Sequence, residues 1–179
     1  MNLYEKLYNS VIMRFFQYID YIEFLRKKGA IIGENCEIYK TASFGSEPYL
    51  IKIGNHVRIN SGVQLVTHDG GLWVLRDKSA GYGDEFSEAD RFGKIIIHDN
   101  VHIGTNSIIM PGVEIGKNSI IGCGAVVTKS VPANEIWGGV PACYIESLSE
   151  YAEKARKRYV NTKSFDFVTK KKWLQQYFE

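Results

Sequence analysis

The chain has 179 residues, enough for one domain with its own hydrophobic core and too few for two domains of ordinary size. Its composition, 45% hydrophobic and 23% charged, excludes both a disordered chain and a bundle of membrane helices. A net charge of +2 at pH 7 lacks the basic excess typical of nucleic-acid binding, so we expect no nucleic-acid partner.

Residues 1–28 have the pattern of an amphipathic helix. Apolar residues recur at steps of three and four between Leu3 and Leu25, and basic residues precede Gly29, a typical helix stop. We expect this helix to cap one open end of the structure that follows. The alternative is a helix that lies on a membrane surface, because it combines aromatic residues with a basic end.

Charged residues interrupt the apolar stretches of this first segment, so we expect neither a membrane-spanning helix nor a secretory leader in it. The three cysteines, Cys36, Cys123 and Cys143, form no C-x-x-C pair, which speaks against a disulfide framework and a structural zinc site. We therefore expect a cytoplasmic protein, either free or at the inner face of the membrane.

The middle of the chain is a repeat of six residues. An aliphatic residue recurs at every sixth position, at Ile97, Ile103, Ile109, Ile115, Ile121 and Val127. Four residues after each of these, a second column holds only small or β-branched residues, namely Val101, Ser107, Val113, Ser119, Ala125 and Val131. The same frame occurs over residues 32–49 and 53–70, with a three-residue slip at 50–52 between them.

A period of six fits neither an α-helix nor one long strand, and it is typical of short strands joined by turns. Three such units make one coil, and successive coils stack about 4.7 Å apart, like neighbouring parallel strands. We predict an all-β solenoid, a parallel β-helix of four to five coils, over residues 29–146. Glycines that directly follow the first column, such as Gly33, Gly54, Gly104 and Gly116, are expected at corners with unusual backbone angles.

Residues 71–94 break the period over a length that an ordinary connection does not need. They carry Trp73, Arg76, Tyr82 and a run of acidic residues. Long loops that project from a solenoid are usually functional, and we expect the same here. The alternative is a disordered insertion without a role.

Residues 147–179 form a C-terminal extension with an excess of basic residues. Ser149, followed by acidic residues in the next turn, predicts a helix over Ser149–Arg158. We interpret Lys170–Lys172 as a solvated face. The predicted organisation is thus a helix over 1–28, a β-helix with its loop over 29–146, and a helical tail over 147–179.

The repeat, continued by the motifs at Ile121–Pro132 and Gly138–Ala142, resembles the left-handed parallel β-helix (hexapeptide-repeat) acyltransferases. The segments Tyr21–Gly29, Thr67–Asp69 and Phe92–Ile95 are similar to bacterial O-acetyltransferases of capsular polysaccharide, lipopolysaccharide or exopolysaccharide synthesis. The resemblance implies left-handed coils, acetyl-CoA as acyl donor without a metal, and homotrimers with active sites between subunits.

His68 is the candidate general base, at the last regular position before the long loop. A neutral imidazole accepts a hydroxyl proton near pH 7, which acetyl transfer to a sugar alcohol requires. Asp69 is a candidate for orienting the imidazole. Because neighbouring side chains of an extended chain point in opposite directions, the alternative is that Asp69 faces away.

For the acyl donor, the resemblance implies contacts with five residues of the C-terminal coils: Thr105, Cys123, Gly124, Thr128 and Lys129. Their alternative role is coil packing alone. The family often has a basic residue directly after Ala142, where this chain has Cys143. We expect a substitute phosphate partner among Arg156, Lys157 and Arg158.

For the acceptor, we expect the loop to supply Trp73 and Tyr82 as aromatic platforms and Arg76 as a hydroxyl partner. The alternative for Trp73 is a packing role that fixes the loop to a neighbouring coil.

The predicted function is direct transfer of acetyl from acetyl-CoA to a hydroxyl of a surface-polysaccharide sugar or its precursor. One alternative is N-acetylation of an amino sugar. Another is a metal-dependent carbonic anhydrase built on similar coils, which needs three histidines at one zinc, whereas His98 and His102 are spaced differently from that family. A non-catalytic scaffold is the third.

Overall fold

The computed structural model describes residues 20–179, so most of the helix predicted over 1–28 lies outside the described residues. The described residues divide into two compact units, the first ending at Leu148 and the second comprising Ser149–Glu179. Each unit is described by itself.

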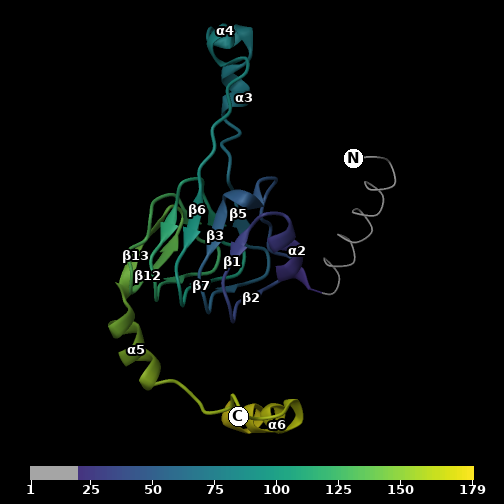
Figure 1. Ribbon diagram of the computed structural model, residues 1–179. Helices are drawn as coiled ribbons and strands as arrows, with labels where there is room; N and C mark the ends of the chain where they lie inside the picture. Colours follow the sequence, from purple (N-terminus) through teal and green to yellow (C-terminus); the bar gives the residue numbers. More distant parts are fainter. Residues whose placement is uncertain (1–19) are drawn as a thin grey trace, which may run out of the picture. The chain divides into compact units, whose positions relative to one another are not determined.

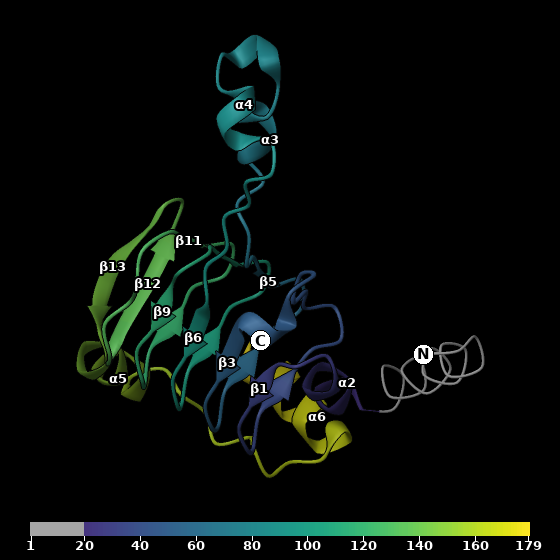
Figure 2. The same cartoon turned by 45° about the horizontal axis from the view of Figure 1, so that its top comes forward.

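The first unit is a solenoid built on three parallel sheets, the arrangement expected of a left-handed β-helix (Figure 1). Sheet 1 consists of β1 (Ile31–Ile32), β3 (Ile51–Ile53), β6 (Ile95–Ile97) and β9 (Glu114–Ile115), which lie side by side in Figure 2. Sheet 2 contains β2 (Glu37–Ile38), β4 (Arg58–Ile59), β7 (His102–Ile103), β10 (Ile120–Ile121) and β12 (Glu135–Gly139). Sheet 3 contains β5 (Gln64–Leu65), β8 (Ile108–Ile109) and β11 (Val126–Val127). The second, third and fourth coils each place one strand in every sheet in turn, so the predicted parallel solenoid is confirmed.

Both predicted columns line the core. The aliphatic column from Ile97 to Val127 is at most 1% exposed, and the second column, from Val101 to Val131, is at most 3% exposed. The buried hydroxyl of Ser107 lies 2.9 Å from the carbonyl oxygens of Gly104 and Gly122, which satisfies a polar group inside an apolar core.

The predicted reason for the glycines at the corners is wrong. Gly54, Gly104 and Gly116 do not have a positive φ, but a Cβ there would collide with the next coil; at Gly116 it would lie 2.4 Å from the Ala133 nitrogen. These glycines allow close approach of two backbones. Positive φ occurs later in each corner, at Asn35, His56, Asn100, Asn118 and Asn134 between sheets 1 and 2, and at Gly62, Asn106 and Gly124 between sheets 2 and 3.

The corner between sheets 1 and 2 is held by a ladder of side chains. His56 Nδ1 lies 2.8 Å from Asn100 Oδ1, Asn100 Nδ2 donates to Asn118 Oδ1, and Asn118 Nδ2 donates to Asn134 Oδ1. Asparagine suits these positions because it tolerates the left-handed conformation and has a donor and an acceptor. His56 therefore has a structural role.

Helix α2 (Tyr21–Lys27) covers the first coil, as predicted for the described end of the N-terminal helix. Asp20 caps its start by accepting from the Glu23 amide, and Leu25 is 2% exposed within the core cluster. The Arg26 guanidinium donates hydrogen bonds to the carbonyl oxygens of Ile32 and Gly33. These bonds satisfy two backbone acceptors at the exposed edge of the first coil. Among residues 20–179, no helix is long and apolar enough to cross a membrane.

The three-residue slip is taken up by a 3-10 turn, η1 (Pro48–Leu50). The long loop contains α3 (Leu72–Leu75), η2 (Lys78–Ala80) and α4 (Gly83–Phe86), and it projects from the coils between β5 and β6 (Figure 1). An antiparallel bridge between His68 and Phe92 closes its base. The loop thus contains regular secondary structure.

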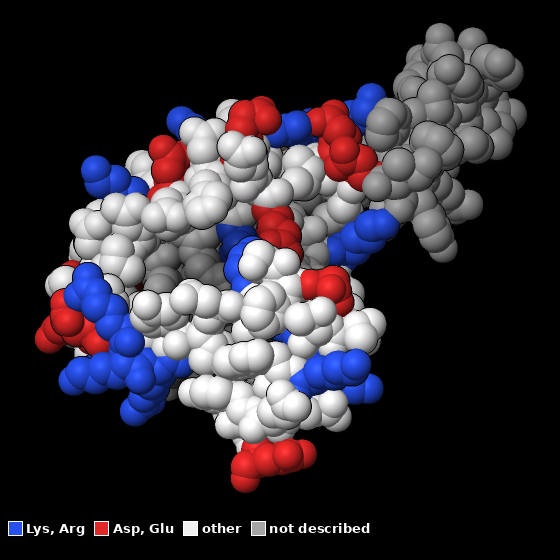
Figure 3. Space-filling model, turned by 90° about the horizontal axis from the view of Figure 1, so that it is seen from below, with Lys and Arg blue, Asp and Glu red and all other residues white. Residues whose placement is uncertain are grey.

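The last coil ends in a hairpin that the repeat did not predict, because β13 (Ala142–Ser147) pairs antiparallel with β12. Helix α5 (Leu148–Arg156), close to the predicted helix, begins at the last residue of the first unit and continues in the second. The second unit also contains α6 (Phe167–Tyr177), which includes the exposed Lys170–Lys172. In the view of Figure 3, basic and acidic side chains are interspersed among uncharged ones, and neither sign covers the whole face.

His102, on β7, predicts a pH-dependent stability. Burial lowers its pKa from the ordinary 6.5, the positive charge of Arg58 lowers it further, and Glu37 opposes both. Between the two pKa values the unfolded chain binds more protons than the folded protein, so stability falls as the pH drops below 6.5. We expect the urea midpoint to fall between pH 7.5 and pH 5, and to fall less in His102→Gln; equal losses would contradict this.

Candidate active site

One edge of the solenoid brings the candidate base together with a carboxylate. We call the edge between sheets 3 and 1 the His68 corner; it comprises residues 44–50, 66–69 with 91–94, 110–113, and 128–130, from the first coil to the fourth. His68 leaves this corner in the second coil, at the base of the loop, with 48% of its side chain exposed.

Glu47, in the preceding coil, holds the His68 imidazole. Its Oε2 lies 3.1 Å from His68 Nδ1 and accepts a hydrogen bond of 2.7 Å from the hydroxyl of Thr67, which is buried. The hydrogen bonds from Thr67, and then those from Ser46 and His68, lower the pKa of the Glu47 carboxyl. Glu47 is therefore ionised at neutral pH.

An ionised Glu47 fixes the tautomer of His68. A carboxylate only accepts hydrogen bonds, so Nδ1 of the neutral imidazole carries the hydrogen and donates a hydrogen bond to Glu47 Oε2. Nε2 then has a free lone pair that can take a proton from a substrate hydroxyl. The Phe92 ring packs edge-on against the imidazole, with 6.2 Å between the ring centroids, and limits its rotation.

Asp69 makes its contacts with the loop. Its Oδ1 accepts from the Gly71 amide at 2.9 Å, and its Oδ2 lies 3.5 Å from Arg91 Nη1. The Asp69 amide also donates to the Arg91 carbonyl, across the closed base of the loop. The imidazole contact thus belongs to Glu47, and the contacts of Asp69 are those of a residue that fastens the loop.

Sequence reasoning missed Glu47, although a signal for it existed. The first two coils pair with an offset of 21 residues, since Ile31 lies opposite Lys52 and Glu37 opposite Arg58. That offset is one coil plus the three-residue slip, and it separates Glu47 from His68 as well. Adding the three-residue slip to the length of one coil would have predicted that Glu47 lies next to His68.

The five candidate donor residues lie on both sides of sheet 3. Thr105, Cys123 and Gly124 are at the corner between sheets 2 and 3, whereas Thr128 and Lys129 are at the His68 corner. Cys123, Gly124, Thr128 and Lys129 are exposed, and nothing lies within 4 Å of the place that a Cβ of Gly124 would take.

Between these two corners, the outward residues Ile108 and Val126 of sheet 3 form a half-buried apolar strip. An apolar strip with polar corners fits a long substrate arm that carries amide groups. Cys143, which replaces the family's basic residue, is exposed on β13. Arg156, Lys157 and Arg158 belong to the second unit.

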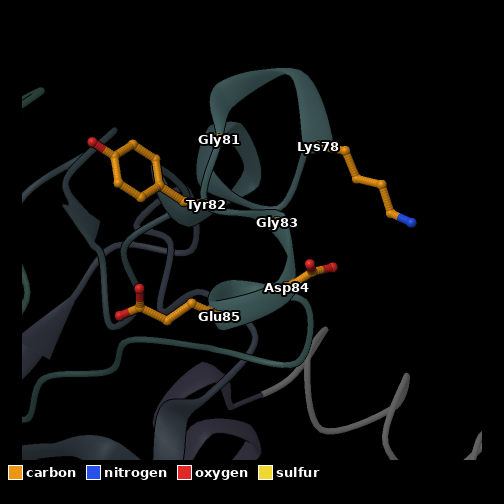
Figure 4. Close-up of a pocket in the computed structure, with 6 residues that line it drawn as sticks. All are labelled: Lys78, Gly81, Tyr82, Gly83, Asp84 and Glu85. Atoms are coloured by element: carbon orange, nitrogen blue, oxygen red, sulfur yellow. The ribbon is translucent and has the colours of Figure 1, made fainter.

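The three candidate acceptor residues do not converge. Trp73 is 78% exposed and Tyr82 is 54% exposed, so neither ring fixes the loop to a coil of its own chain. Arg76 Nη2 donates to the Ala89 carbonyl and to Asp90 Oδ1, both at 2.5 Å, and holds the loop closed. Around the hollow at the loop tip, the side chains of Lys78 and Tyr82 point in opposite directions (Figure 4).

The histidines considered for a metal lie in other contacts. His98 Nε2 is 2.6 Å from Glu114 Oε1, and His102 lies on a different sheet. Within residues 20–179, no three or more His, Cys, Asp or Glu side chains are grouped as metal ligands.

Comparisons with known proteins identify the family of the repeat. The family model described as bacterial transferase hexapeptide (six repeats) matches residues 94–129. Protein CapG of Staphylococcus aureus is 46% identical over 157 residues, which cover 87% of each chain. A galactoside O-acetyltransferase of Lactococcus lactis is 34% identical over 150 residues, which cover 72% of this chain and 68% of that one.

A solved structure shares the fold. It is a hexapeptide-repeat-containing acetyltransferase from Vibrio cholerae in complex with acetyl coenzyme A, and it is 31% identical. The match has a TM-score of 0.56 and covers 68% of this chain and 61% of that one.

Proposed function

The chain belongs to the hexapeptide-repeat acetyltransferases, and on that premise we propose that it transfers acetyl from acetyl-CoA to a hydroxyl of a bacterial surface-polysaccharide sugar or its precursor. The observation that carries the proposal is the Glu47–His68 pair, which presents a free Nε2 to solvent at a corner shared with Thr128 and Lys129. The relatives named for galactoside O-acetylation and for an acetyl-CoA complex support the reaction class.

The chemistry needs only this one base. His68 Nε2 takes the proton of the acceptor hydroxyl as the oxygen attacks the thioester carbonyl of acetyl-CoA. The C–S bond then breaks, and the imidazolium returns its proton to the departing CoA sulfur. Glu47 orients the ring and stabilises its positive charge, as an orienting carboxylate does in other acyl-transfer sites. A backbone amide at the corner stabilises the oxyanion.

Acetyl-CoA supplies the acetyl group as a thioester. We assign its long arm to the strip of Ile108 and Val126, with Thr105, Cys123, Gly124 and Thr128 at the edges and Lys129 near a phosphate. A homotrimer, with this strip facing the next subunit and the loop contributing Trp73 and Tyr82 to a neighbour, completes the proposal. We place the reaction in the cytoplasm, free or at the inner face of the membrane.

A CoA-release assay tests the function. Purified protein with acetyl-CoA is given neutral sugars, uronic acids, sugar phosphates and amino sugars, and thiol release is followed. We expect release with hydroxyl acceptors that lack an amine. Release with amino sugars alone would replace O-acetylation by N-acetylation, and the absence of release with every acceptor would overturn the proposal.

Glu47→Gln tests the orienting role. A glutamine keeps the shape but loses the charge that favours the imidazolium, so we expect kcat to fall about 10- to 100-fold, the effect of losing one hydrogen bond to a charged group. The KM for acetyl-CoA should stay unchanged, because Glu47 contacts His68 and not the proposed donor strip. The control is Asp69→Asn, which should lower kcat less; the reverse order would assign the role to Asp69.

A further inference from the structure

A cavity opens on the side of the His68 corner where the coils begin. It has a volume of about 410 Å³ and lies between α2 and the first coil. Its walls are aromatic and small polar residues, with one lysine: Tyr21, Phe24, Phe44, Ser43, Ser46 and Lys28. This volume is in the range of small-molecule sites.

The walls of the cavity are fixed. Tyr21 donates a 2.6 Å hydrogen bond to the Ala42 carbonyl, stacks on Phe24 at 5.9 Å between ring centroids, and meets Phe44 edge-on at 6.4 Å. Because the rings are held by these contacts, the cavity is formed without a ligand. Rigid aromatic walls with hydroxyl groups beside them are suited to a sugar ring.

The cavity reaches the catalytic pair through one residue. Ser46 and Pro48 line it, and Glu47 between them turns its carboxylate to His68. Adjacent Cα atoms are about 3.8 Å apart, so the cavity is lined by the two chain neighbours of the residue that holds the imidazole.

The position of the cavity along the corner matters as well. The proposed donor residues belong to the third and fourth coils, His68 to the second, and the cavity to the first. One coil beyond His68, nothing lies within 4 Å of the place that a Cβ of Gly112 would take. Along the stack of coils, the proposed donor residues and the cavity therefore lie on opposite sides of the coil that carries His68.

Lys28 gives the cavity a charge. Its ammonium lies 5.9 Å from the centroid of the Phe24 ring, and within residues 20–179 it forms no ion pair. Its neighbour Arg26, by contrast, already contacts Glu23 and Glu34. An ammonium held beside an aromatic wall favours an anionic group of a ligand in the cavity.

We propose that this cavity binds the sugar unit next to the acetylated one, and that Lys28 selects an acceptor with an anionic group, a uronic acid carboxylate or a phosphate, on that unit. The inference rests on the proposed O-acetyltransferase function and adds the class of its acceptor. It also assigns a binding role to α2, which otherwise only caps the coils.

The test compares acceptors that differ in one charge: cellobiose with cellobiouronic acid, and lactose with lactose 1-phosphate. The wild-type protein should have a KM about tenfold lower for at least one charged acceptor than for its neutral partner, and the better charged acceptor identifies the group. Lys28→Met should abolish that preference by raising the KM for the charged acceptor to that of its neutral partner. Lys52→Met, at an exposed lysine of β3, is the matched control and should keep the preference.

A second variant tests the cavity apart from the charge. Ser43→Phe fills it, and the KM should rise severalfold for charged and neutral disaccharides alike. Two results would overturn this inference and leave the O-acetyltransferase function intact. One is a wild-type protein that has the same KM for charged and neutral acceptors, and the other is a Lys28→Met variant that still prefers the charged acceptor. No CoA release with any acceptor would overturn the function itself.

Discussion

His68→Ala is expected to lower kcat for acetyl transfer by about 10³-fold, the contribution of a well-placed general base. Without the imidazole, the base that takes the proton of the acceptor hydroxyl is missing. The KM for acetyl-CoA should change little, because the proposed donor strip lies one coil or more beyond His68. CoA release with a sugar acceptor measures both constants.

The matched control for His68→Ala is His56→Asn. Asparagine is the residue at the equivalent corner position of four other coils, at Asn35, Asn100, Asn118 and Asn134, and it tolerates the positive φ of 55° at His56. This variant removes a histidine without removing the proposed base, so it should keep full activity. If His68→Ala retained near-complete transfer, direct base catalysis by His68 would be contradicted.

The six-residue period was sufficient to predict the core, because every coil needs aliphatic or small side chains at the same inward positions. Successive coils stack about 4.7 Å apart, and the inward position of each coil must be aliphatic. The segment from Ile97 to Val127 therefore shows the same aliphatic position six times. The corner glycines show where the reasoning stopped. In the sequence, a glycine that is required for close packing cannot be distinguished from one that is required for a positive φ. The structure distinguishes them, because a Cβ at Gly116 would collide with the backbone of Ala133.

The candidate site was predicted in part, for a related reason. His68 could be found because it stands where the repeat ends, whereas Glu47 precedes η1 and belongs to the site only through the coil offset of 21 residues. The cavity depends on the angle at which α2 meets the first coil, which no local pattern states. The hairpin of β12 and β13 likewise follows from the end of stacking rather than from the period.

The requirement for close approach between coils leads to a stability prediction. Gly116→Ala should lower the free energy of unfolding by about 3 kcal/mol, the upper range for overpacking a well-packed site. The new methyl group would lie 2.4 Å from the Ala133 nitrogen and 2.8 Å from the Ala133 Cα and the Pro132 carbonyl carbon. All three atoms are backbone, so the fourth coil has to move away from the last one.

Thermal unfolding measures this effect, and Gly70 provides the control. Nothing lies within 4 Å of the place that a Cβ of Gly70 would take, and its φ is not positive. Gly70→Ala should therefore change stability by less than about 0.5 kcal/mol. For a chain of this length, Gly116→Ala should lower Tm by about 6–12 °C. Equal Tm values for the two variants would show that the coils have room at Gly116, and the narrow spacing would then not be the reason for glycine there.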